Sequence, residues 1–121
     1  TSSDQLGPCA TSSARFKEDI EELGEASEQV FNLRPVKFRY KEEIAGSGVR
    51  SIQYGLLAEE VAEIYPQLVT YDDQGRPFTV RYEVLTPLLL NELKRLRSDM
   101  VELREAVARL EGGLAQSAAF E

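Results

Sequence analysis

The chain has 121 residues, of which 42% are apolar and 29% are charged, and its formal net charge at pH 7 is −7. This composition is typical of a folded soluble domain. The negative charge disfavours a nucleic-acid partner, because phosphate binding needs clustered Lys and Arg. One local group of cations lies in Arg34–Lys41, where it alternates with apolar residues and is better explained as the solvent face of a strand. The longest apolar run is far too short for a bilayer, so we expect no membrane contact.

The chain lacks the residue types on which several kinds of site depend. It contains no histidine and a single cysteine, Cys9. An intrachain disulfide, a cysteine zinc site, a Ser-His-Asp triad and a histidine metal site are therefore excluded. The acidic run Glu18–Glu22 has the spacing of a solvated helix face, so we expect no metal and no cofactor. Any general base must be Lys, Asp or Glu.

The first two thirds of the chain predict a small α+β module. Residues 1–11 are small and polar and are expected to form an extended lead-in. The predicted elements of the module, in chain order, are a helix at Ala26–Leu33, a strand at Val36–Lys41, a loop at Glu42–Ser51, a strand at Gln53–Ala58, a helix at Glu59–Tyr65 and a hairpin of Leu68–Tyr71 with Phe78–Tyr82. We place the module at residues 12–84.

A long C-terminal helix is predicted after the module. Thr86 is a suitable N-cap and Pro87 a favourable first residue, and the helix is expected to run to about Glu111, before Gly112 and Gly113. At 1.5 Å per residue it would be about 40 Å long. We assign residues 85–113 to this helix and residues 114–121 to a frayed tail.

Apolar residues along this helix follow a heptad pattern. Their spacing alternates between four and three residues over Leu89, Leu93, Leu96, Met100, Leu103, Val107 and Leu110, and continues to Leu114. This spacing keeps one apolar seam facing a partner helix. Glu92 with Arg97, and Asp99 with Arg104, stand at the positions that pair across a parallel coiled coil. An amphipathic helix packed on its own module explains the apolar stripe but not these charges, so the pattern favours parallel self-association. The residues of the seam do not fix the number of strands.

Five segments, in order, resemble one known family. Ser12–Ile20, Leu33–Tyr40, Tyr54–Val61, Ile64–Val69 and Val80–Leu89 are similar to motifs of the endosialidase-type intramolecular chaperone domains. These domains are autoproteolytic C-terminal modules of phage tail spikes and fibres and are related to the cleavage domain of myelin regulatory factor. The resemblance covers about residues 12–96.

The resemblance implies a homotrimer joined by a coiled coil. Such a module helps an upstream β-rich trimeric domain of the same chain to fold in register and is then released by self-cleavage at its own N-terminal boundary. Residues 1–11 would be the remnant of that upstream protein. Release removes the trimerised helper and makes unfolding of the upstream trimer slow. The implied location is the host cytoplasm during folding and the virion tail afterwards.

The family cleaves itself with a serine and a lysine five residues apart, which implies Ser12 and Lys17 here. In a chain without histidine, a neutral lysine amine is one of few bases for a serine hydroxyl. The lysine must first lose its proton through burial or nearby positive charge, for which Arg15 is a candidate. Ser12 Oγ would attack an adjacent backbone carbonyl, and water would hydrolyse the ester. The module would thus be a serine peptidase that acts once, on its own chain.

Other interpretations of these residues stay open. The family usually has Asp where this chain has Ser13, which would slow or abolish cleavage if that Asp orients the nucleophile. Ser13 is also an alternative nucleophile. A further alternative is that neither Ser12 nor Lys17 is catalytic, because serines are common in this Ser/Thr-rich lead-in and Lys17 is then a solvated charge. The chain would then be a non-cleaving trimerisation or tip domain of a tail fibre or surface protein. A third interpretation is that the chain is part of a transcription factor that is released from a membrane by proteolysis.

Overall fold

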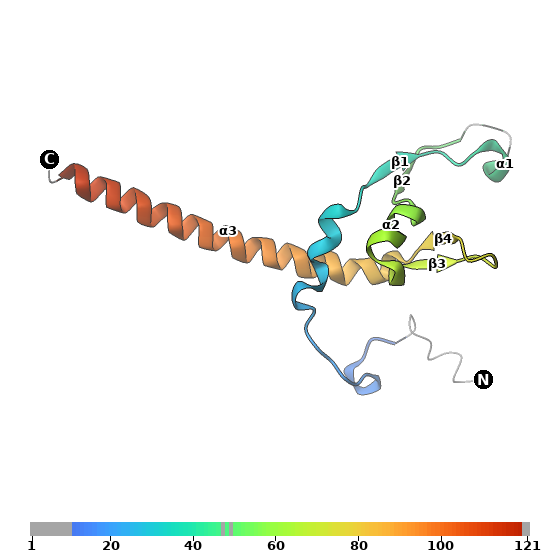
Figure 1. The fold of residues 1–121 in the computed structure, drawn as a ribbon, viewed down its shortest axis with the longest axis horizontal. Coiled ribbons are helices and arrows are strands. Elements are labelled where there is room, and N and C mark those ends of the chain that lie inside the picture. Colours follow the sequence, from blue (N-terminus) through green and yellow to red (C-terminus); the bar gives the residue numbers. More distant parts are fainter. Residues whose placement is uncertain (1–10, 47, 49, 120–121) are drawn as a thin grey trace.

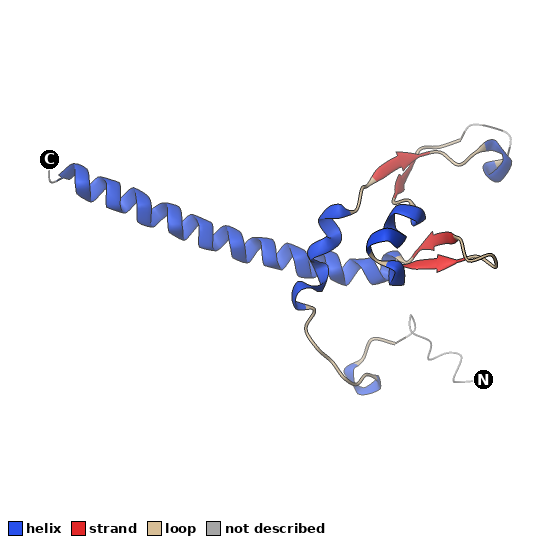
Figure 2. Cartoon of the chain, viewed as in Figure 1, coloured by secondary structure: helices blue, strands red, loops and turns tan. Residues whose placement is uncertain are grey.

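The computed structural model describes residues 11–46, 48 and 50–119, and it consists of a head of short elements at one end of a long helical rod (Figure 1). The rod is α3, Tyr82–Ala119, whose 38 residues extend about 57 Å at 1.5 Å per residue. The head contains both helices and strands, and all of its strands are short (Figure 2). The predicted class, a mixed helix and strand module followed by a long C-terminal helix, is confirmed.

The head contains two separate two-stranded antiparallel sheets. The first half of the chain comprises the 3-10 helices η2 (Ala14–Phe16) and η3 (Gly24–Asn32), strand β1 (Val36–Phe38), helix α1 (Glu42–Ala45) and strand β2 (Gln53–Gly55). The second half comprises helix α2 (Ala58–Ile64), 3-10 helix η4 (Pro66–Leu68), strands β3 (Val69–Tyr71) and β4 (Pro77–Val80), and then α3. β1 pairs with β2, with Lys37 opposite Tyr54. β3 pairs with β4, with Val69 opposite Val80.

The core of the head is small and lies where α2, η4 and β3 meet the first turns of α3. Its buried apolar side chains are Val61, Tyr65, Leu68, Val69, Leu85 and Leu88. The apolar residues of α2 and α3 recur at three- and four-residue intervals, so each helix presents one face to this core. The N–H of Arg81 donates to Leu68 O at 2.6 Å, which joins the start of α3 to η4. A core this small stabilises only the head, and most of the rod extends beyond it.

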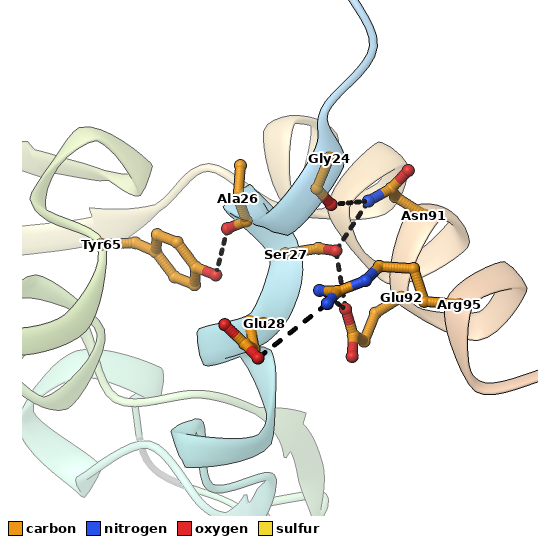
Figure 3. A network of polar contacts seen from close by, with 8 residues as sticks. All are labelled: Gly24, Ala26, Ser27, Glu28, Tyr65, Asn91, Glu92 and Arg95. Carbon is orange, nitrogen blue, oxygen red and sulfur yellow. Dashed lines mark hydrogen bonds and ion pairs between the residues drawn. The ribbon is translucent and has the colours of Figure 1, made fainter. Parts of the chain in front are cut away.

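Buried polar contacts hold η3 across α3 (Figure 3). Ser27 is fully buried, and its Oγ donates to Glu92 Oε1 at 2.8 Å. Asn91 Nδ2 donates to Ser27 Oγ at 2.8 Å and to Gly24 O at 3.0 Å, while Arg95 Nη1 donates to the same Glu92 oxygen at 3.0 Å. The Glu92 carboxylate is thus both paired and hydrogen-bonded, the condition under which a charge tolerates burial.

Several predicted elements differ from the structure. Ala26–Leu33 was expected to be an α-helix, but η3 has 3-10 geometry and begins at Gly24, whose φ of 57° suits a residue without a Cβ. The expected loop at Glu42–Ser51 includes α1. The predicted hairpin is confirmed as β3 paired with β4. β1 is three residues shorter than expected, and the segment expected to be one strand at Gln53–Ala58 ends as β2 at Gly55.

The long helix begins and ends outside its predicted limits. It starts at Tyr82, so Thr86 is not its N-cap; instead, Thr86 Oγ1 donates to Tyr82 O within the helix at 3.1 Å. Pro87 lies inside α3, where its missing N–H leaves the Glu83 carbonyl without its helical hydrogen bond. Packing of Leu85 and Leu88 in the core outweighs that loss. The predicted end at Glu111 is also wrong, since the backbone stays helical through Gly112 and Gly113 to Ala119.

Candidate functional site

A single 3-10 turn brings Ser12 and Lys17 together. In η2, the N–H of Phe16 donates to Ser13 O and the N–H of Lys17 donates to Ala14 O, both at 3.1 Å. This turn reverses the chain between the two side chains, and Lys17 Nζ donates to Ser12 Oγ at 3.2 Å. A neutral amine at the same place would accept the hydroxyl proton of Ser12, which is the contact that a serine–lysine dyad requires.

The alternative nucleophile, Ser13, has a different partner. Arg15 Nη1 donates to Ser13 Oγ at 3.3 Å, and the Arg15 guanidinium lies 4.5 Å from the centre of the Phe16 ring. A guanidinium carries no acceptor and keeps its proton in proteins, so it is unsuited to activate a hydroxyl. Of the two neighbouring serines, only Ser12 is hydrogen-bonded to a side chain that can act as a base.

The dyad lies on an exposed segment. Ser12 and Lys17 are both accessible to water, and the segment that carries η2 lies apart from the rest of the head (Figure 1). The apolar residues of this segment are also uncovered, with Phe16, Ile20 and Leu23 exposed to 51%, 70% and 40%. A lysine in water is ordinarily protonated at neutral pH. The lone chain therefore has the contact but not the surroundings of an active dyad.

A large apolar groove lies on another side of the head, between η3, the β1–β2 sheet and α3. Its volume is about 740 Å³, and its walls include Val30, Val36, Leu56, Leu85 and Leu89. Among the described residues that line it, Lys37 alone carries a charge. This size is within the roughly 300–1,000 Å³ of binding pockets, and so apolar a lining suits apolar side chains better than a polar ligand.

The predicted seam of α3 is uncovered in the single chain. Leu89, Leu93, Leu96, Met100, Leu103, Val107 and Leu110 have exposed fractions between 44% and 69%. A hollow of about 410 Å³ opens between Met100, Leu103 and Val107. Leu114 belongs to the part of the helix whose side chains are outside the described residues.

Glu92, which was expected to pair with Arg97 of a second copy, has other partners within its own chain. Glu92 has only 6% of its surface exposed and contacts Ser27 and Arg95 instead. Sequence reasoning missed this network, because Ser27 has no motif around it and Glu92 also fits a heptad flank. The only signal was the polar pair Asn91–Glu92 within the most apolar part of the helix.

Metal and membrane sites can be examined over the described ranges. Within residues 11–46, 48 and 50–119, no group of three or more His, Cys, Asp or Glu side chains is arranged to hold a metal ion. No helix in these ranges combines the length and apolar character that crossing a bilayer requires.

The comparison with known families gives one match. Residues 12–70 match the family model described as chaperone of endosialidase. The match begins at Ser12 and ends in β3, so it includes η2, η3, the first sheet and α2. The similar segment at Val80–Leu89 lies outside the matched range. The curated proteins yielded no match to this chain.

Proposed function

Because residues 12–70 belong to the endosialidase chaperone family, we propose that the chain is a C-terminal intramolecular chaperone. In this proposal it trimerises, assists the folding of an upstream β-rich domain of a fibre or spike, and releases itself by Ser12–Lys17 autoproteolysis. The observation that carries the cleavage step is the 3.2 Å contact between Lys17 Nζ and Ser12 Oγ. The partners would be two further copies and the upstream domain, and folding would take place in the host cytoplasm before the parent joins a virion tail.

The exposed seam of α3 supports self-association. Burying one large aliphatic side chain stabilises a protein by about 1.5–3 kcal/mol. The seven seam residues of one copy are 44% to 69% exposed, so burying them between copies would stabilise an assembly. The hollow between Met100, Leu103 and Val107 has the position of a hole for a side chain of a facing helix. Association along the rod would hold the heads side by side at one end, because all of the heads are on the same end of α3.

The proposed cleavage is an acyl shift followed by hydrolysis. Neutral Lys17 Nζ removes the hydroxyl proton of Ser12 as Oγ attacks the carbonyl carbon of Thr11. The bond between that carbon and the Ser12 nitrogen breaks, the nitrogen takes up the proton, and an ester joins Thr11 to Ser12 Oγ. Water then cleaves the ester, which leaves a carboxylate on Thr11 and restores the serine hydroxyl. No cofactor is needed.

The test compares variants of the protein that retains its upstream segment. We expect the unaltered chain to yield a fragment beginning at Ser12, while Ser12→Ala and Lys17→Ala remain intact by mass spectrometry. Ser13→Ala is the matched control and should be cleaved, because Ser13 contacts Arg15 rather than a base. Sedimentation of each variant should give a trimer. A trimer that stays uncleaved in every form would overturn the proposed peptidase.

A non-cleaving structural trimerisation or tip domain is the second candidate. Two observations favour it: Ser12 and Lys17 are open to water, and Ser13 stands where the family usually has Asp. Ser13→Asp discriminates between the two functions. If this substitution produces cleavage in a protein that is otherwise intact, the natural chain is the structural form of the fold.

A further inference from the structure

The segment that carries the dyad has apolar residues without a partner. We define the arm as residues 14–23, between the dyad serine and η3. Phe16, Ile20 and Leu23 recur along it and are largely exposed. Three large apolar side chains on one short segment are costly to leave in water, at up to about 1.5–3 kcal/mol each. The arm thus has the composition of a segment that docks on another surface.

The charges of the arm and of the groove have opposite signs. The arm carries the acidic side chains Glu18, Asp19, Glu21 and Glu22, against the two cations Arg15 and Lys17. The groove is bordered by β1, and Lys37 in this strand and Arg39 just after it form no ion pair with any described residue. A second hollow, lined by Lys37, Phe38, Arg39 and Ile52, adjoins the groove along β1. An acidic, apolar segment therefore matches an apolar groove with a basic border.

The groove of the same copy is poorly placed for its own arm. The arm joins η3 at Gly24, whereas the groove begins at Val30 near the other end of that helix. The two ends of η3 are about 18 Å apart, at 2 Å per residue over nine residues, and the arm leaves on the side away from β1 (Figure 1). Leu89 lines the groove and is also the first seam residue, so the groove opens beside a neighbouring copy.

We propose that the arm of each copy docks into the groove of a neighbouring copy, with Phe16, Ile20 and Leu23 between the apolar walls and the acidic residues facing Lys37 and Arg39. The inference rests on the self-association proposed above. It deepens that function, because the Ser12–Lys17 site is then completed by a second copy. Docking would take the Lys17 amine out of water and pair the neighbouring carboxylates with cations of the second copy, and removal from water disfavours the charged form of an amine. Cleavage would follow assembly for this reason.

Disulfide trapping between two differently tagged chains tests the docking. Both chains carry Ser12→Ala, which prevents cleavage, and Cys9→Ser, which removes the natural thiol. One chain also carries Ile20→Cys and the other Tyr54→Cys; these side chains are 70% and 80% exposed, so neither substitution disturbs the core. Phe16→Cys is a second arm position. The control replaces Tyr54→Cys with Ile44→Cys, an exposed site on α1 away from the groove.

We expect mild oxidation of the mixed assembly to link arm and groove cysteines of different chains, at least ten-fold more than arm and Ile44→Cys chains. A single chain carrying both Ile20→Cys and Tyr54→Cys should form dimers and larger linked species rather than an internal disulfide. An assembly that sediments as an oligomer without these links, or links only within one chain, overturns the docking and leaves the proposed function standing. A monomer overturns both.

Discussion

The contact between Gly55 and Tyr82 allows a sharp test of how the head is assembled. Tyr82 Oη accepts a hydrogen bond from the Leu56 N–H at 3.0 Å. A Cβ at position 55 would lie 2.6 Å from the same oxygen and 3.5 Å from Phe38 Cε1. The substitution Gly55→Ala must therefore displace the Tyr82 ring. We expect it to lower the free energy of unfolding by about 2 kcal/mol, from overpacking of about 1–3 kcal/mol and the loss of one hydrogen bond.

Tyr82→Phe separates the steric part of this cost. Alone, it removes the acceptor of the Leu56 N–H and should cost about 1 kcal/mol. In the Tyr82→Phe background the oxygen is gone, so Gly55→Ala should cost well under 1 kcal/mol. The double variant should then be more stable than the sum of the single costs predicts, by about 1 kcal/mol or more.

Urea unfolding at one fixed protein concentration measures these values, since the stability of an oligomer depends on concentration. Gly112→Ala is the matched control, because Gly112 lies in α3 with nothing within 4 Å of a new Cβ. It should raise stability by about 0.5–1 kcal/mol, the usual gain of Ala over Gly in a helix. Strictly additive costs at Gly55 and Tyr82, or a neutral Gly55→Ala, would refute the close packing of β2 on α3.

Two further predictions concern charges in the head. Ser27→Ala should cost about 1–3 kcal/mol, because it removes a hydrogen-bond donor from the buried Glu92; an unchanged urea midpoint would contradict this. The Arg34 hydrogen bond lowers the pKa of Glu60, and the Arg76 backbone N–H lowers the pKa of Asp72. Depressed folded-state pKa values stabilise the fold above about pH 4, and this stability is lost as pH falls through them. Asp72→Asn should therefore flatten the dependence of the urea midpoint on pH below about pH 4, and an unchanged slope would count against it.

The sequence predicts the head where local pattern and tertiary packing agree. The alternation in Val36–Lys41 correctly indicates a strand, and the turn residues between β3 and β4 correctly indicate a hairpin. The prediction fails at the start of α3. Thr86 and Pro87 have the local sequence pattern of a helix start, but the helix begins before them, at Tyr82. The contacts of Leu85 and Leu88 with the core extend the helix backwards past that signal, and no local motif reports such contacts.

The candidate site was also predictable only where local sequence decides the structure. The resemblance, through the five-residue spacing of its serine and lysine, indicated Ser12 and Lys17, and a local turn is sufficient to bring them into contact. It left Ser13 open as an alternative nucleophile, and the contact of Ser13 with Arg15 could not be read from the sequence. The groove was not predicted either. It is formed by residues from four elements, and their assembly is a property of the whole head.

α3 both packs on the head and carries the seam, and for this reason its apolar face is broad in the first turns and narrow beyond them. Leu85, Leu88, Glu92 and Arg95 form the stripe that packs on the head, whereas the seam begins at Leu89. At 100° per residue, the centres of the two stripes are about 70° apart around the helix. Both fit on the first turns without competing for the same surface. Beyond Arg95 the large apolar side chains of the described helix, which are the seam residues and Val101, are exposed. The burial of Glu92 therefore leaves the seam residues free to face a neighbouring helix.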